Sequence, residues 1–124
     1  MEDRETRLAR GTALAKRMFA GAPGGGTRLP ARMREFTFEH LFGNVWQGDE
    51  MALEERSLIT CAALVAMNRS AEQRLHFVGA KNLGIPRSKI EGMITHLAHY
   101  AGWPCAASAF GVLNEVWPQQ EAAS

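Results

Sequence analysis

Hydrophobic positions recur at helical spacing along most of the chain. In the segment 53–67, Leu58, Cys61, Ala62 and Val65 stand at i, i+3, i+4 and i+7. A second stripe in the segment 88–101 contains Ile90, Met93, Ile94, Leu97, Ala98 and Ala101, and it stops at Gly102. Weaker patterns predict helices over about 3–19, 30–46, 70–82 and 104–116. The sequence therefore predicts an all-α fold of about six helices, forming a single domain over residues 1–124.

Capping and breaking residues mark the ends of these helices. Pro30 suits the first turn of the second helix, and Asn68 ends the third. Two segments of the form S-x-x-E/Q, beginning at Ser70 and Ser88, resemble capping boxes and place helix starts there. The Gly/Pro-rich stretch 21–30 lacks the Lys-Ser/Thr ending of a phosphate loop. We expect it to be a mobile connector.

Composition and charge exclude several classes of partner. The 124 residues, 13.6 kDa in mass, carry 14 Lys and Arg against 13 Asp and Glu, for a formal charge of +1. This balance gives no electrostatic case for nucleic acid or an anionic membrane. The longest uncharged apolar run, 61–67, is far shorter than the ~20 residues that span a bilayer. We expect a cytoplasmic protein with no nucleic-acid or membrane partner.

The apolar faces of the segments 53–67 and 88–101 cover wide arcs. Such helices have to be covered on more than one side, and six helices in a chain of this length supply only part of that cover. The sequence therefore predicts that the chain associates with copies of itself.

The four histidines are the first candidates for chemistry, because imidazole titrates near neutral pH. His76 lies four positions after Glu72, so both share a helix face, and His96 is in line with Tyr100. Taken alone, each histidine is more often a hydrogen-bonded structural residue. His96 and His99 have a spacing that can chelate, but neither an HExxH motif nor a cysteine pair accompanies them. We expect no metal and no organic cofactor.

The two cysteines are far apart and lie inside apolar segments. Buried free thiols are favoured over a disulfide between Cys61 and Cys105. Cys105 follows Pro104 at a helix start, where a thiol pKa can fall, so it is the more reactive candidate, although packing is the simpler role for both.

Several blocks of the sequence resemble the carboxymuconolactone decarboxylase family. These are LFGNVW (41–46), LEERSLIT (53–60), Leu75-His76 followed by Ala80, Asn82 and Gly84, ITHLA (94–98), YAGWP (100–104), and Ala106 to Phe110. The similarity covers residues 36–117, the family core, and leaves 1–35 as an N-terminal helix and a Gly-rich loop. It implies a fold of about six helices shared with alkylhydroperoxidase AhpD-like proteins, assembled as homotrimers or homohexamers.

The resemblance also separates two branches of chemistry. The peroxidase branch uses a CxxC pair followed by a histidine. Here His76 matches that histidine, Arg69 and Glu72 occupy the two cysteine positions, and Ser57 occupies the position of an upstream carboxylate. Thiol redox chemistry of that kind therefore lacks its thiols. The remaining branch decarboxylates a small carboxylated lactone without a cofactor.

Such a decarboxylation leaves a dienolate-like charge on oxygen. A site for it needs a cation for the substrate carboxylates, a donor near the oxyanion, and an acid that protonates carbon. We expect Arg56 to orient a carboxylate, His76 to transfer the proton, and His96 to donate to the enolate oxygen. The residues expected to line the substrate pocket are Trp46, Glu72, Tyr100 and Trp103.

Each of these assignments has a structural alternative. Arg56 could form a salt bridge with Glu54, Glu55 or Glu72, and Trp46 and Trp103 could simply pack at helix ends. For the whole protein, the alternative is a non-catalytic oligomer that binds a small molecule. Histidines locked into backbone hydrogen bonds in a filled pocket would favour that alternative, and an open pocket holding both His76 and His96 would favour the enzyme.

Overall fold

The computed structural model describes residues 2–23 and 28–119, and this part of the chain contains helices and turns but no strand. The helices are α1 (Arg4–Met18), α2 (Ala31–Glu35), η1 (Phe36–Leu41), η2 (Val45–Gln47), α3 (Leu53–Ala66), α4 (Ser70–Asn82), α5 (Arg87–Ala101) and α6 (Trp103–Val116). The predicted all-α class is confirmed. The centre of the Gly-rich stretch, 24–27, lies outside the described residues, so its predicted mobility stays a prediction.

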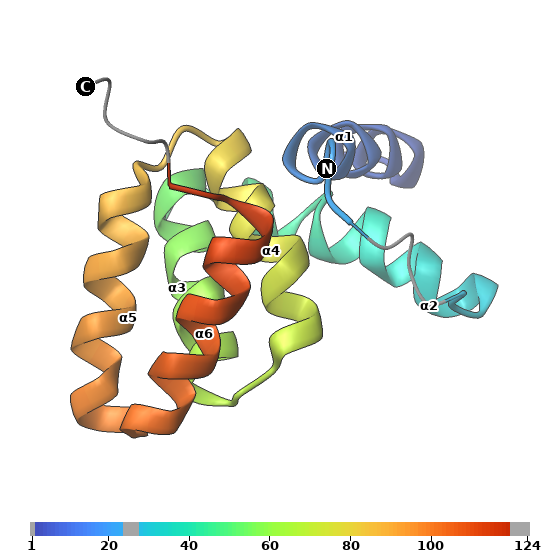
Figure 1. The fold of residues 1–124 in the computed structure, drawn as a ribbon. Helices are drawn as coiled ribbons and strands as arrows, with labels where there is room; N and C mark the ends of the chain where they lie inside the picture. Colours follow the sequence, from blue (N-terminus) through green and yellow to red (C-terminus); the bar gives the residue numbers. More distant parts are fainter. Residues whose placement is uncertain (1, 24–27, 120–124) are drawn as a thin grey trace.

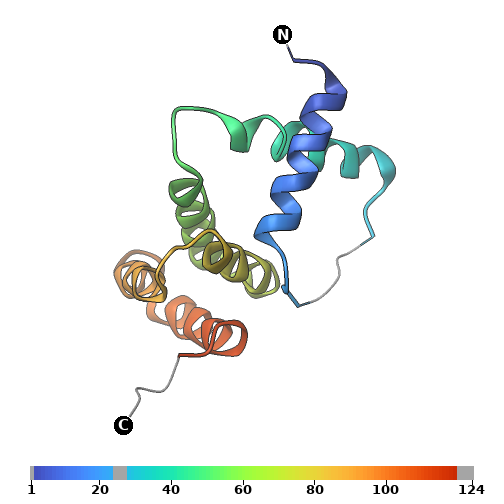
Figure 2. The same cartoon turned by 90° about the horizontal axis from the view of Figure 1, so that it is seen from above.

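The helices α3 to α6 form an antiparallel bundle (Figure 1). Viewed along the bundle, α3 packs beside α4 and α5, and α6 packs beside the same two helices (Figure 2). Helices α4 and α5 therefore stand at opposite corners. The core between them is apolar and includes Cys61, Val65, Phe77, Ile90, Ile94, Ala109 and Leu113, which are fully buried. Ile90, Ile94 and Ala98 belong to the stripe that predicted α5, so this expectation is confirmed.

A second, smaller core joins the N-terminal arm, which consists of α1, α2, η1 and η2, to the bundle. It contains Leu14, Ala15, Met18, Phe42, Trp46 and, from the end of α4, Leu83. Figure 2 shows the C-terminal end of α1 meeting α4. Helix α1 also crosses η1 so closely that only glycine fits at Gly11 and Gly43, where an added Cβ would meet the opposing backbone. The Arg10 guanidinium donates to the Gly43 carbonyl oxygen at 2.7 Å and fixes this crossing.

The predicted second helix is not continuous. Its expected span, 30–46, is divided into the short α2, the π-helix η1, a turn and the 3₁₀ turn η2. In η1 the Phe42 N–H donates to the carbonyl of Thr37, five residues earlier. The widened turn precedes Gly43, whose backbone lies against that of α1. Local periodicity predicted a helix here, but the packing of α1 alters its geometry.

The two predicted capping boxes are also wrong in detail, although α4 and α5 begin within one residue of the expected places. Ser70 and Ser88 lie inside their helices, whose N-caps are Arg69 and Pro86 without a side-chain cap bond. Gln73 instead donates to the Leu64 carbonyl of the neighbouring α3, and Glu91 pairs with Arg87. The Glu55 carboxylate accepts the Ala52 N–H at the start of α3, where no such motif was expected.

The helix ends marked by Asn68 and Gly102 agree with the prediction. Both residues have a positive φ, of 58° and 109° respectively, a conformation that stops a right-handed helix. Among the described helices, none is both long and apolar enough to cross a membrane.

Candidate active site

His76 lies in the middle of α4 on the side that faces α1. Its imidazole meets the ring of Phe19 edge to face, with the centroids 5.2 Å apart and the planes at 85°. The atom Nδ1 is buried and has no hydrogen-bond partner among the described residues. The residue as a whole is half-buried. His76 is therefore not held by a hydrogen bond at Nδ1 within the described part of the chain.

Burial is the main influence on the charge of His76. It lowers the pKa of the imidazole below the usual 6.5, because the protonated ring would lose hydration, while the Glu72 carboxylate one turn earlier acts in the opposite direction. The pKa of Glu72 is itself lowered, first by its hydrogen bond from Arg69 at 2.9 Å. The free protein therefore holds His76 neutral at pH 7, with a carboxylate on the same helix face.

The cross-helix register sets the Cys61 turn of α3 level with His76. The Cys61 thiol donates to the His76 carbonyl oxygen at 3.5 Å, which sets the two antiparallel helices level at this point. Ser57 is fully buried. It lies one turn before Cys61, and because the helices are antiparallel it stands level with the turn that follows His76.

The Arg56 guanidinium is buried and already engaged. It donates through Nη2 to Glu50 Oε1 at 2.6 Å and to the Gly48 carbonyl at 3.2 Å, and the residue is only 8% exposed. Its partner is therefore Glu50 rather than one of the three glutamates considered from the sequence. The buried Nε has no partner in the described part of the chain. A catalytic role for Arg56 stays a prediction.

Trp46 belongs to the second core. It is 7% exposed and packs against Phe42, with the ring centroids 5.6 Å apart. This burial agrees with the structural alternative, packing at a helix end, and a role of Trp46 in lining a substrate pocket stays a prediction.

His96, Tyr100 and Trp103 lie away from His76. His96 is exposed on α5 and stacks on Tyr100, with the centroids 4.9 Å apart. Tyr100 and Trp103 are 77% and 67% exposed. Since α4 and α5 occupy opposite corners and His76 faces α1, a single chain does not bring His76 and His96 into one pocket. This is the main difference from the site expected from the sequence.

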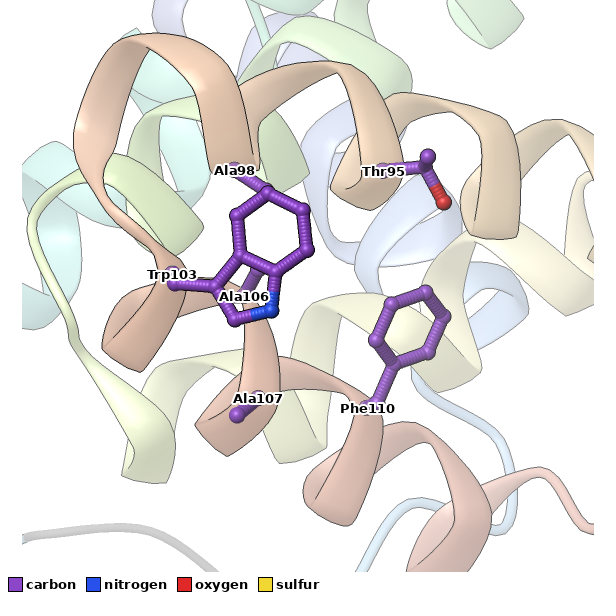
Figure 3. Close-up of a pocket in the computed structure, with 6 residues that line it drawn as sticks. All are labelled: Thr95, Ala98, Trp103, Ala106, Ala107 and Phe110. Carbon is purple, nitrogen blue, oxygen red and sulfur yellow. The ribbon is translucent and has the colours of Figure 1, made fainter.

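Trp103 lines a separate hollow between α5 and α6 (Figure 3). The cavity has a volume of about 240 Å³ and is largely apolar; its lining consists of Thr95, Ala98, Trp103, Ala106, Ala107 and Phe110. His99 meets Trp103 edge to face, and its Nδ1–H donates to the Thr95 carbonyl oxygen at 3.0 Å. Within the described residues, no three His, Cys, Asp or Glu side chains gather closely enough to hold a metal ion.

Both cysteines are free thiols, as the sequence predicted, but only Cys61 is buried as expected, whereas Cys105 is half-buried. Burial raises the pKa of the Cys61 thiol to about 12, with a smaller opposing effect of the Ser57 hydroxyl. Only about one Cys61 in 10⁴ is then a thiolate at pH 8, and the thiolate is the reactive form.

We therefore expect iodoacetamide at pH 8 to alkylate Cys105 and to spare Cys61 in the native protein, with mass spectrometry as the readout. The raised pKa of the Cys61 thiol also contributes to the free energy of unfolding. This contribution is present below pH 9 and is lost as the pH rises from 9 toward 12, because the unfolded chain releases the thiol proton first. Equal labelling of both thiols in folded protein would contradict this assignment.

Phe19, Glu50 and Asn82 were not expected to belong to the site. Phe19 covers His76, Glu50 holds Arg56, and the Asn82 amide donates to the carbonyls of Met18 and Ala20. Asn82 stood in one of the blocks that carried the family resemblance, which was the available signal. Phe19 and Glu50 gave no signal, since their partners are distant in sequence or outside the helix pattern.

The site residues thus lie on a small all-α bundle whose helix α4 carries His76 and meets α1. The family model described as "Carboxymuconolactone decarboxylase family" matches residues 26–115. The chain belongs to this family. The matched region starts earlier than the resemblance in the sequence, which covered 36–117.

Two curated proteins are similar to the chain. It is 31% identical over 84 residues to the 4-carboxymuconolactone decarboxylase of Acinetobacter baylyi, covering 68% of this chain and 63% of that protein. It is 32% identical over 82 residues to the nitrosuccinic acid decarboxylase of Metarhizium robertsii, covering 66% of this chain and 57% of that protein. The chain thus spans about three-fifths of the length of each relative it matches.

Proposed function

We propose that the protein is a cofactor-independent carboxy-lyase acting on a small carboxylated cyclic substrate, with His76 as its proton-transfer residue. The observation that carries the proposal is the half-buried His76, whose Nδ1 has no partner among the described residues and which stands at the position that the resemblance matches to the histidine of the peroxidase branch. Membership of the family and similarity to two proteins named as decarboxylases support the reaction class.

The proposed reaction has three steps. The substrate carboxylate leaves as CO₂, and its bonding electron pair passes into the conjugated carbonyl to give a dienolate. A proton from the His76 imidazolium then forms the new C–H bond, and the neutral imidazole regains a proton from water. An anionic substrate next to His76 favours the protonated ring, so substrate binding supplies the acid that the free protein lacks at pH 7.

Arg56 is the proposed cation of this site. Its guanidinium is buried, lies on the helix beside α4, and carries a buried Nε–H without a described partner. A guanidinium in a site that excludes water attracts a carboxylate more strongly than one at the surface. Glu72 lies on the same helix face as His76, and its negative charge favours the imidazolium form.

The test is a substrate screen with the purified protein. 4-Carboxymuconolactone, nitrosuccinate and simple β-keto acids are incubated with the protein, and CO₂ release is followed against protein-free controls. We expect release from the carboxylated lactone, and we expect it to survive dialysis against a chelator. Absence of release from every acid, together with saturable binding of one of them, would favour the non-catalytic alternative.

We also propose that the protein assembles as a homotrimer or homohexamer. Large apolar side chains on the surface of the bundle support this, including Ile59, Met67, Tyr100 and Trp103, each more than half exposed in the single chain. Light scattering at micromolar concentration is expected to give three or six times the chain mass of 13.6 kDa. A monomeric mass would contradict the assembly. In an oligomer, His96 and Tyr100 would reach a site only from a second copy.

A further inference from the structure

The side chain of Asn82 closes the C-terminal end of α1. Its amide nitrogen donates one proton to the Met18 carbonyl at 2.7 Å and the other to the Ala20 carbonyl at 2.8 Å. Carbonyls in the last turn of a helix lack partners within the helix, so both bonds satisfy groups that would otherwise be unpaired. The contact joins segments more than sixty residues apart in the sequence.

The two carbonyls belong to the residues on either side of Phe19, so Asn82 fixes the backbone that carries this ring. The ring lies over α4, edge to face with His76 at 5.2 Å. An added Cβ at Gly79 would stand 3.3 Å from Phe19 Cε1, which shows how closely the ring approaches the helix. His76, Gly79 and Asn82 follow one another at three-residue spacing and share the face of α4 that meets α1.

We propose that Asn82 is a positioning residue for His76, holding Phe19 against the imidazole through the end of α1. This inference rests on the proposed role of His76 in proton transfer. Asparagine suits the position because its amide supplies two donors to two carbonyls, which neither aspartate nor leucine provides. The other face of the arm is held by Phe42, whose ring meets Phe19 edge to face at 5.7 Å.

The contact with Phe19 controls how much water reaches the imidazole. If the end of α1 separates from α4, the ring of His76 gains hydration and its pKa rises toward the ordinary 6.5. Glu72, which pairs with Arg69, is the charged group whose field acts on the imidazole, and the Cys61 thiol of α3 donates to the His76 carbonyl. The substitution of Asn82 changes none of these groups, so the solvation of the ring is the variable that moves.

The test uses Asn82→Ala and Asn82→Ser in the full chain, with Asn114→Ala as the matched control. Asn114 also makes a side-chain hydrogen bond, accepting from Arg87 at 2.6 Å, but it lies on α6 away from α1. The pKa of His76 is measured from its ring resonances by NMR, without substrate. We expect it to rise in Asn82→Ala, to rise less in Asn82→Ser, and to stay unchanged in Asn114→Ala.

Activity supplies the second readout. With the substrate found by the screen, kcat is expected to fall about tenfold in Asn82→Ala, while KM stays within about twofold, because the acid is misplaced rather than the binding contacts removed. Should Asn82→Ala not fold, Asn82→Ser, which retains a hydroxyl donor, carries the test.

The outcomes separate the two proposals. An unchanged His76 titration in a folded Asn82 variant would overturn the positioning role. A shifted titration with unchanged kcat, in a protein where His76→Gln is inactive, would also overturn it. A shifted titration together with an active His76→Gln variant would support the contact between Asn82, Phe19 and His76 and would overturn the proposed function instead.

Discussion

His76→Gln is expected to lower turnover by about 10² to 10⁴, while the protein stays folded and keeps its oligomeric mass. Glutamine retains the approximate size and hydrogen-bonding capacity of histidine but does not titrate near neutrality. Loss of general acid–base catalysis has this magnitude, equivalent to about 3–5 kcal/mol in the barrier. Turnover and thermal unfolding are measured on the same sample.

The pH profile makes this expectation more specific. Burial places the pKa of His76 below 6.5 in the free protein. If the imidazolium is the acid, kcat/KM of the wild type falls as the pH rises above that pKa, and the variant lacks this limb. His40→Gln is the matched control, since His40 is exposed on η1, and it should leave both turnover and the profile unchanged.

Near-normal turnover in a folded His76→Gln protein would remove His76 from the mechanism. His96→Gln distinguishes the remaining possibilities. His96 is exposed on the opposite corner of the bundle, so a loss of turnover on its replacement would place a second copy's α5 at the site. If neither replacement reduces turnover, the proton comes from another group.

Gly11→Ala is expected to be the most destabilising small substitution, at about 3 kcal/mol or roughly 10 °C in Tm. The new Cβ would lie 2.6 Å from the Gly43 nitrogen and nearer still to the Phe38 carbonyl oxygen. Both obstacles are backbone atoms, so relief requires α1 to move away from η1. That movement would also weaken the second core, which holds Met18, Phe42 and Trp46 together.

Gly92→Ala provides the control for this effect. Gly92 lies on the exposed side of α5, and an added Cβ there meets none of the described residues within 4 Å. Alanine is the better helix former by about 1 kcal/mol, so this variant should be as stable as the wild type or slightly more stable. Chemical denaturation of the two variants checks the comparison. If both substitutions have equal effects, the close crossing of α1 and η1 does not determine stability.

The sequence by itself determined the features that depend on neighbours along the chain. The apolar stripes predicted α3 and α5 because residues three and four apart lie on one face of a helix. Asn68 and Gly102 marked helix ends because their conformation is a local property of the backbone. The blocks around His76 and the YAGWP segment were sufficient to indicate the family.

The tertiary structure decided the features that depend on contacts between distant segments. The π-helix at 36–41 accompanies the crossing at Gly11 and Gly43, which no periodicity in the segment reveals. Several glutamates stand close enough to Arg56 in the sequence to form an ion pair with it. The ion pair with Glu50 is formed because the folded loop before α3 brings that carboxylate to the guanidinium.

The largest difference concerns the composition of the site. Sequence reasoning grouped His76 with His96, Tyr100 and Trp103 because all were polar or aromatic residues in family blocks. The bundle puts α4 and α5 at opposite corners, and it places Phe19 and Asn82 beside His76 instead. Helical periodicity states which face of a helix is buried, but which helix covers that face follows from how the helices pack together.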